Sequence, residues 1–273
     1  MIRILGIDLS LHPLFVIIML FSVLTGQFLE LLTLFTIVLI HELGHVVAAL
    51  LVGVTVKSVQ LLPFGGVAVI EDHGRLTASR EIGIALAGPL QNGIMIVIAL
   101  GLQQAGYGNQ EFLTYFINAN AIIALFNLLP VLPLDGGKVL QATVSLFLPY
   151  YYTLLWSGRV SVAASILVIG AGGGLRLNMV MIGAFLLYSN FTDHRNLPYR
   201  FVAFLMNREA VYEYHLRTGS VARPIVALSA KPLDAILRLF KRNQYHFIYV
   251  LNGKGNVVAV VPEQRLISTY FGI

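Results

Sequence analysis

Four stretches of this sequence are long and apolar enough to cross a lipid bilayer, and they constrain the fold more than any other feature. Three carry no Asp, Glu, Lys or Arg and one is interrupted by HELGH and Gly53; they span residues 9–29, 31–56, 82–110 and 112–134. A transmembrane helix needs about 20 apolar residues. The chain is also only 11% charged, whereas soluble domains have about 25% charged residues. The sequence therefore predicts an α-helical polytopic membrane protein.

Two further spans are expected at residues 154–174 and 177–192, which gives about six transmembrane helices. Eleven of the 18 Lys and Arg residues follow Asp193. Basic residues gather on the cytoplasmic side of a membrane protein, so both termini are predicted to be cytoplasmic. The basic residues are scattered and do not indicate direct nucleic-acid binding.

The HELGH motif places three ionisable side chains inside the second apolar stretch. Such groups are costly in a bilayer unless they are paired or bound to something. His41 and His45 are four residues apart, so a helix puts both on one face, where their imidazoles can hold one Zn²⁺. Glu42 lies beside them and is the candidate general base for a water activated by the metal.

A catalytic zinc site usually has a third protein ligand, and Asp135 is the candidate that the sequence offers. It follows Pro130 and Pro133, which end a helix, and precedes Gly136 and Gly137. The alternative is that Asp135 only caps a helix. Asn127 is a candidate for binding a substrate carbonyl or stabilising an oxyanion.

The two motifs together resemble those of the site-2 protease family of intramembrane zinc metalloproteases. HELGH matches the first motif, and FNLLPVLPLDGG, residues 126–137, matches the second at Asn127, Pro130, Asp135 and Gly136. The resemblance covers about residues 1–192. It implies His41, His45 and Asp135 as ligands of one Zn²⁺ and Glu42 as the base.

The small tail and the lack of an inserted PDZ domain resemble the sporulation branch of this family. That resemblance implies a membrane-associated pro-sigma factor as substrate and inhibitory membrane proteins as partners. It also implies a location in the mother-cell membrane that surrounds the forespore.

Residues 54–72, between the second and third apolar stretches, predict a short membrane-associated β-hairpin around Pro63, Gly65 and Gly66. A strand edge there could hold an extended substrate by β-augmentation; the alternative is a purely structural hairpin. ALAGPLQNG, residues 85–93, has the small residues typical of close helix packing, and no chemistry is assigned to it.

The predicted domains are the protease at 1–192, a linker with some helix at 193–222 and a small α/β unit at 223–273. Strands are expected around PIVAL and in a hairpin turning at 252–255, with helices at 231–243 and from Pro262 onward. This order resembles a single CBS motif, a type that binds adenine nucleotides between paired copies, so pairing would join two chains in a homo-oligomer. Arg265 stands where many such motifs have an Asp for ribose, which argues against nucleotide binding. A docking or dimerisation module is the alternative.

The competing hypothesis for the whole chain is a non-proteolytic membrane transporter or scaffold whose tail senses a ligand. It predicts no dependence on Glu42 and no stoichiometric zinc.

Overall fold

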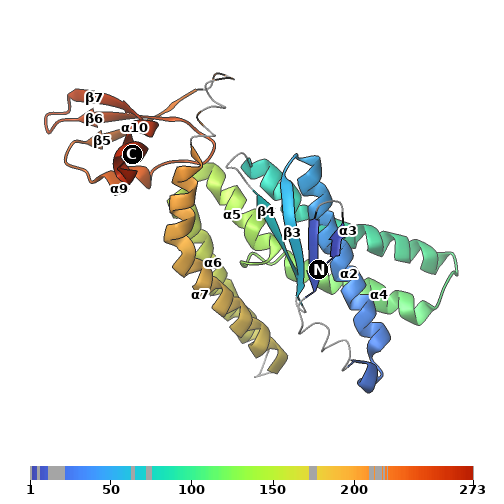
Figure 1. Cartoon of the computed structure of the whole chain (residues 1–273). Coiled ribbons are helices and arrows are strands. Elements are labelled where there is room, and N and C mark those ends of the chain that lie inside the picture. The colour runs from blue at the N-terminus through green and yellow to red at the C-terminus, as the bar shows by residue number, and fades with distance from the viewer. Residues whose placement is uncertain are drawn as a thin grey trace. The chain divides into compact units, whose positions relative to one another are not determined.

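The structure is a computed structural model that describes residues 2–4, 7–11, 22–62, 65–71, 76–171, 177–208 and 221–272, together with residues 212, 217 and 219. The long helices are α2 (Phe28–Leu51), α3 (Ala78–Gln104), α4 (Gln110–Asn127), α5 (Asp135–Phe147), α6 (Tyr150–Ala171) and α7 (Leu177–Met206) (Figure 1). In the part of the chain that is described, three of these helices are long and apolar enough to cross a membrane: α2, α3 and residues 150–170 of α6.

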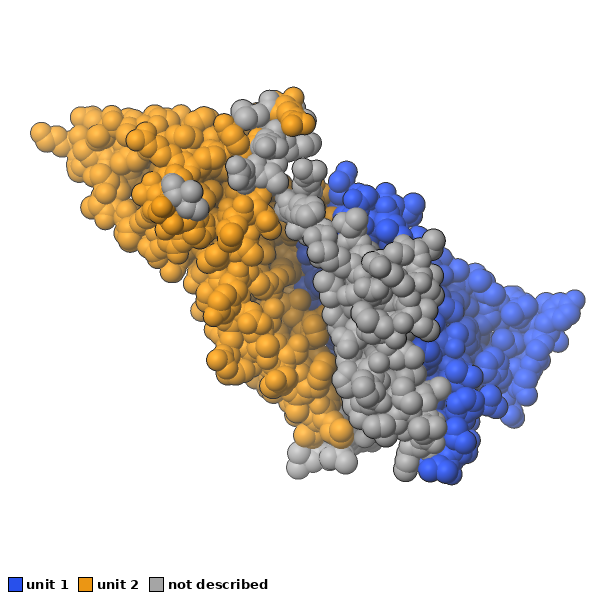
Figure 2. Space-filling model, in the orientation of Figure 1, with its two compact units in different colours: residues 1–72, 80–130, 134–139 blue, residues 73–79, 131–133, 140–273 orange. Residues whose placement is uncertain are grey.

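The chain forms two compact units, coloured separately in Figure 2. Unit 1 contains residues 1–72, 80–130 and 134–139, and unit 2 contains residues 73–79, 131–133 and 140–273. The segment that starts α5 thus belongs to unit 1, and the rest of α5 belongs to unit 2.

Unit 1 packs α2, α3 and α4 around a small core of Ile37, Met95 and Ala119. Gly44 of α2 allows α3 to approach closely, because a Cβ there would lie 2.9 Å from the Ala87 carbonyl oxygen. Asn109 caps α4, since its side chain accepts hydrogen bonds from two backbone N–H groups of the first turn.

A four-stranded sheet in the order β1-β2-β3-β4 accompanies these helices in unit 1. Its strands are β1 (Ile2–Ile4), β2 (Ile7–Leu11), β3 (Thr55–Leu62) and β4 (Gly65–Glu71). The hairpin predicted at 54–72 is confirmed as β3 and β4, which pair antiparallel, whereas the parallel pairing of β3 with β2 was not predicted. Both hairpin strands lie against α2 (Figure 1), and β4 is an edge strand of the sheet.

The strand assignments correct two of the predicted spans. The first cannot start at Leu9, because residues 9–11 are part of β2, and residues 12–21 lie outside the described residues. The second was predicted to reach Val56, but α2 ends at Leu51 and Gly53 has a positive φ of 80°, which favours glycine. The third and fourth correspond to α3 and α4, with the latter ending three residues before Pro130.

Unit 2 contains α6, α7 and the C-terminal elements. The turn that precedes Asp135 is held here through both polar backbone groups of one residue: the Leu132 N–H donates to Ser161 Oγ at 3.0 Å, and the Leu132 carbonyl accepts from Asn190 Nδ2 at 2.8 Å. Because Ser161 and Asn190 are both buried in the helix pair, these bonds satisfy backbone groups that would otherwise be costly.

The tail follows the predicted β-α-β-β-α order: β5 (Arg223–Leu228), α9 (Leu233–Leu237), β6 (His246–Leu251), β7 (Val257–Pro262) and α10 (Glu263–Phe271). The helix predicted at 231–243 is shorter, because α9 has only five residues. Two residues of α7, Phe201 and Leu205, belong to the same hydrophobic core as Ile248 and Leu237. Residues 193–206 of the predicted linker are therefore the end of α7, which is continuous to Met206.

Candidate metal centre

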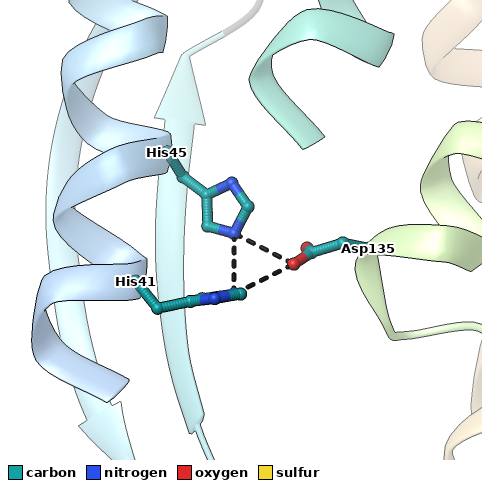
Figure 3. Close-up of side chains that lie close together, drawn as sticks. All are labelled: His41, His45 and Asp135. Atoms are coloured by element: carbon teal, nitrogen blue, oxygen red, sulfur yellow. Dashed lines mark hydrogen bonds and ion pairs between the residues drawn. The ribbon is translucent and has the colours of Figure 1, made fainter. Parts of the chain in front are cut away.

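Two imidazoles and one carboxylate converge in unit 1 (Figure 3). His41 and His45 lie one turn apart on α2, and Asp135 is the first residue of α5; all three are buried. The Nε2 atoms of the two histidines are 3.2 Å apart, and Asp135 Oδ2 lies 3.1 Å from His41 Nε2 and 3.0 Å from His45 Nε2. Among the described residues this is the one group of His, Cys, Asp and Glu found with metal-binding geometry.

The other ring nitrogen of each histidine faces an acceptor. His41 Nδ1 lies 2.5 Å from Asn92 Oδ1, and His45 Nδ1 lies 2.7 Å from the Ile84 carbonyl oxygen. A neutral imidazole that donates from Nδ1 has its lone pair on Nε2. Both lone pairs therefore point at the same place, together with an oxygen of Asp135.

These residues fit a zinc ion. With zinc–ligand distances of about 2.0 Å and tetrahedral angles, neighbouring ligand atoms lie about 3.3 Å apart, close to the separations found here. Three converging lone pairs repel one another unless a cation is placed among them. Two histidines and a carboxylate are also a usual donor set for catalytic zinc.

Asp135 is the first residue of α5, and its carboxylate faces the histidines. Its Oδ1 accepts from Lys138 Nζ at 3.1 Å. Gly136 allows the start of α5 to pack against the backbone of Leu128 and Leu129, because a Cβ at residue 136 would collide with it. This tight packing fixes the position of the Asp135 carboxylate.

The remaining predicted site residues lie outside this cluster. Glu42 follows His41 on α2 and is half-buried. Asn127 ends α4, and its amide donates to the Ile123 carbonyl of the same helix at 3.1 Å. Pro130 and Pro133 are exposed. Gly65 and Gly66 start β4, where they pair with Leu62 and Leu61.

Sequence reasoning missed three residues of α3 and α4 that support the histidines directly or through one neighbour. Asn92 accepts from His41, Asn120 bonds Asn92 at 2.9 Å, and Gly88 leaves room for both imidazoles. A signal was present for the two asparagines, because an amide within an apolar span is costly unless it has a polar partner. The packing role assigned to residues 85–93 was therefore incomplete.

Two buried histidines on an apolar helix, a buried carboxylate from a second helix and a glutamate next to the first histidine are typical of intramembrane zinc metalloproteases. Comparison with known proteins agrees with this class, and the chain belongs to peptidase family M50, the site-2 proteases. The family model matches residues 29–106 and 95–149.

Three relatives support this assignment. Stage IV sporulation protein FB of Bacillus subtilis is 31% identical over 97% of this chain and 92% of its own length. A putative zinc metalloprotease of Synechocystis is 37% identical over 56% of this chain and 41% of its own length. The solved site-2 protease of Methanocaldococcus jannaschii superposes with a TM-score of 0.57 at 25% identity, covering 71% of this chain and 93% of that one.

The protein is therefore a membrane-embedded zinc metalloprotease of the site-2 type. The family and the three apolar helices of the described chain agree on its membrane character. The competing hypothesis of a non-proteolytic transporter or scaffold finds no support in these relatives.

Proposed function

We propose that the chain is an intramembrane endopeptidase in which His41, His45 and Asp135 hold one Zn²⁺ and Glu42 is the general base. The observation that carries this proposal is the convergence of two Nε2 lone pairs and one carboxylate oxygen within 3.2 Å of one another. When bound, the ion would act as a Lewis acid that lowers the pKa of water and polarises the scissile carbonyl.

The chain's own residues then carry the proton and position the substrate. Glu42 takes a proton from the attacking water as the new C–O bond forms, and it delivers a proton to the amide nitrogen as the C–N bond breaks. Asn127 is the candidate donor to the substrate carbonyl or the oxyanion. Its bond to Ile123 would have to be exchanged for a bond to substrate.

The substrate segment is proposed to bind as an extended strand along β4, near Gly65 and Gly66. Two observations support this: β4 is an edge strand of its sheet, and both hairpin strands contact α2, which carries the histidines. An edge strand offers unpaired backbone groups to an added strand. An extended substrate also exposes the peptide bonds that a helix shields. Pro130 and Pro133, in the turn before Asp135, are further candidates for substrate binding.

The proposed substrate is a membrane-associated pro-protein, the pro-sequence of a sporulation sigma factor. The support is the match to stage IV sporulation protein FB over nearly the whole chain. The same relative supports inhibitory membrane proteins as partners and the membrane around the forespore as the location. Six spans with both termini in the cytoplasm, and domains at 1–192, 193–222 and 223–273, complete the proposed organisation.

The tail is proposed to be a CBS-like module that pairs with the tail of a second chain. One face of its sheet is covered by the helices, with Ile225 and Ile248 in the core. The residues in register on the other face include Val226, Tyr249 and Val260, and both valines are exposed. A second copy of this face would cover that apolar surface. Binding of an adenine nucleotide is the weaker part of this proposal because of Arg265.

Co-expression with a pro-sigma factor, scored for a shortened product, tests the proposed function. Glu42→Gln should leave zinc content unchanged and lower cleavage about 10²–10⁴-fold through loss of the general base. Glu30→Gln, the same substitution at an exposed position of α2, is the matched control and should cleave normally. Normal cleavage by the Glu42 variant, or the absence of stoichiometric zinc in the purified wild type, would overturn the proposal.

A further inference from the structure

Two completely buried asparagines connect the metal centre to α4. Asn92 of α3 and Asn120 of α4 both have zero exposure, and they bond each other in the interior of unit 1. Neither is one of the proposed ligands. Burying an amide in an apolar interior is costly unless its polar atoms form hydrogen bonds. The partners of these two amides therefore indicate what the pair does.

The direction of every bond in this chain follows from its last acceptor. A backbone carbonyl can only accept, so Asn120 Nδ2 must donate to the Phe116 oxygen, at 2.9 Å. Asn120 Oδ1 is then left to accept from Asn92 Nδ2 at 2.9 Å. Asn92 in turn presents Oδ1 to His41 Nδ1 at 2.5 Å. Each amide is therefore fixed in one of its two flipped orientations.

This directionality fixes the tautomer of His41. An oxygen at Nδ1 requires a proton on Nδ1, which leaves the lone pair on Nε2, the atom that faces His45 and Asp135. A flipped Asn92 would present an N–H group to Nδ1 and favour the opposite tautomer, whose Nε2 proton would block coordination.

The two histidines are held in different ways. His45 donates to the Ile84 carbonyl, a backbone group that no substitution removes. His41 depends on side chains alone, and its support extends over two more helices. Substitution of Asn92 or Asn120 therefore acts on the support of His41 and leaves the hydrogen bond of His45 to the Ile84 carbonyl in place.

We propose that Asn92 and Asn120 are positioning residues that hold His41 as the zinc-binding tautomer, with Asn120 acting through Asn92. This inference rests on the proposed function, because it takes His41 to be a ligand. Partners that bond the outer nitrogen of a ligating histidine typically contribute 10–100-fold to metal affinity.

Zinc affinity of the purified full-length protein, measured by competition with a chromophoric chelator, tests this without relying on activity. Asn92→Leu removes the acceptor at similar volume and should weaken zinc binding about 10–100-fold. Asn92→Asp keeps an oxygen facing His41 and should retain more affinity than the leucine variant. Asn120→Leu leaves Asn92 in place but free to flip, so its loss should be smaller than that of Asn92→Leu.

Asn118→Leu is the matched control, because Asn118 is an exposed asparagine of the same helix α4; it should bind zinc like the wild type. The visible spectrum of the Co²⁺-substituted protein gives a second readout, in which Asn92→Leu should alter the ligand-field bands and Asn118→Leu should not. If Asn92→Leu does not accumulate in the membrane, Asn120→Leu carries the same comparison.

Wild-type zinc affinity in both Asn92→Leu and Asn120→Leu would overturn the positioning role. Equal losses in the Asp and Leu variants of Asn92 would also overturn it, since they would indicate packing instead of hydrogen bonding. Failure of the proposed function has a different signature: the wild type itself would not bind zinc, or Glu42→Gln would cleave normally.

Discussion

Gly88 lies on α3 opposite the two histidines and presents no side chain to them. A Cβ at this position would come 2.6 Å from His41 Nε2 and would also collide with His45 Nε2. Both atoms are the proposed zinc-binding nitrogens. The absence of a side chain at residue 88 is therefore as much a requirement of the site as the ligands themselves.

Gly88→Ala should abolish stoichiometric zinc binding and cleavage, because the methyl group competes with the metal for the same nitrogens. Gly93→Ala, on the same helix, adds a methyl that meets nothing within 4 Å, so it is the matched control. Metal analysis of both purified proteins by mass spectrometry makes the comparison. Full zinc content in Gly88→Ala would mean that the metal lies elsewhere.

Asp135→Asn tests the third ligand. The substitution keeps the shape of the side chain but removes the anionic charge, so zinc affinity and cleavage should both fall. Asp234→Asn, at a half-exposed carboxylate paired with Arg238 in the tail, should change neither. Chelator competition measures the affinities, and wild-type affinity in Asp135→Asn would show that another residue is the third ligand.

Residues with a fixed spacing could be predicted from the sequence, and residues that depend on tertiary contact could not. HELGH and the Pro-rich turn before Asp135 are local patterns, so the three residues that converge were identified without a structure. Asn92 and Asn120 are 28 residues apart and meet only through helix packing. Their type signalled a buried role, but nothing in their spacing indicated His41 as the partner.

At the scale of elements, the long apolar stretches predicted where helices occur better than where those helices begin and end. α5 was missed because its first residues, Asp-Gly-Gly, suggest a turn, while packing of Gly136 against the end of α4 stabilises a helix start there. β2 was missed because its last residues, 9–11, belong to the apolar stretch that was predicted to be the first transmembrane helix. Its pairing with β3 depends on residues about 50 positions away, which no local pattern reports.

The tail elements are joined by a buried ionic cluster. Arg208, just after α7, donates to both carboxylate oxygens of Glu263 at the start of α10, at 2.9 and 2.7 Å. His246 of β6 donates from Nδ1 to the same carboxylate at 3.0 Å, and its Nε2 accepts the Lys241 N–H at 3.3 Å. The neutral imidazole of His246 therefore forms hydrogen bonds with both the Glu263 carboxylate and the Lys241 backbone N–H.

Burial lowers the pKa of His246 below its ordinary value, and the nearby guanidinium charges of Arg208 and Arg223 act in the same direction, against the opposing effect of Glu263. The unfolded tail then binds more protons than the folded tail between the folded pKa and about 6.5. Stability contributed by neutral His246 is thus present above about pH 6.5 and is lost as the pH falls toward the folded pKa.

Amide-exchange protection factors of residues 246–251, which correct for the intrinsic pH dependence of exchange, should therefore fall between pH 7 and 5 in the full-length protein. His246→Gln can donate to Glu263 and accept from Lys241 without titrating, so its protection should depend less on pH. Identical pH profiles in the two proteins would contradict the assigned role of His246.

At the scale of the whole molecule, the tail and the ends of α6 and α7 form one hydrophobic unit. Phe201 and Leu205 of α7 pack with Ile248 of the sheet, and Tyr150 and Tyr151 of α6 lie against the same core. Seven of the nine buried residues of this core lie in the β-α-β-β-α unit and two lie in α7. Because such a small unit has limited stability alone, the helices add to its core. The exposed valines of the sheet leave an apolar face for a partner.

Truncation after Pro198 should abolish cleavage of the natural substrate while zinc stays bound. The cut removes the tail together with Phe201 and Leu205 but leaves α2, α3 and the start of α5, which carry the proposed ligands. Zinc content and co-expression cleavage of the truncated and full-length proteins provide the comparison. A shorter truncation that removes only Gly272 and Ile273, beyond α10, is the control and should cleave normally.

Tail pairing can be tested with introduced cysteines, because the chain has none of its own. Val226→Cys lies on the exposed apolar sheet face, and Thr269→Cys lies on an exposed position of α10. If two tails meet through the sheet face, a short bismaleimide should cross-link the Val226 variant into dimers in the membrane and leave the Thr269 variant monomeric. Equal cross-linking of both variants would place the contact elsewhere. Monomers throughout, together with full activity of the protein truncated after Pro198, would show that the tail is dispensable and does not pair.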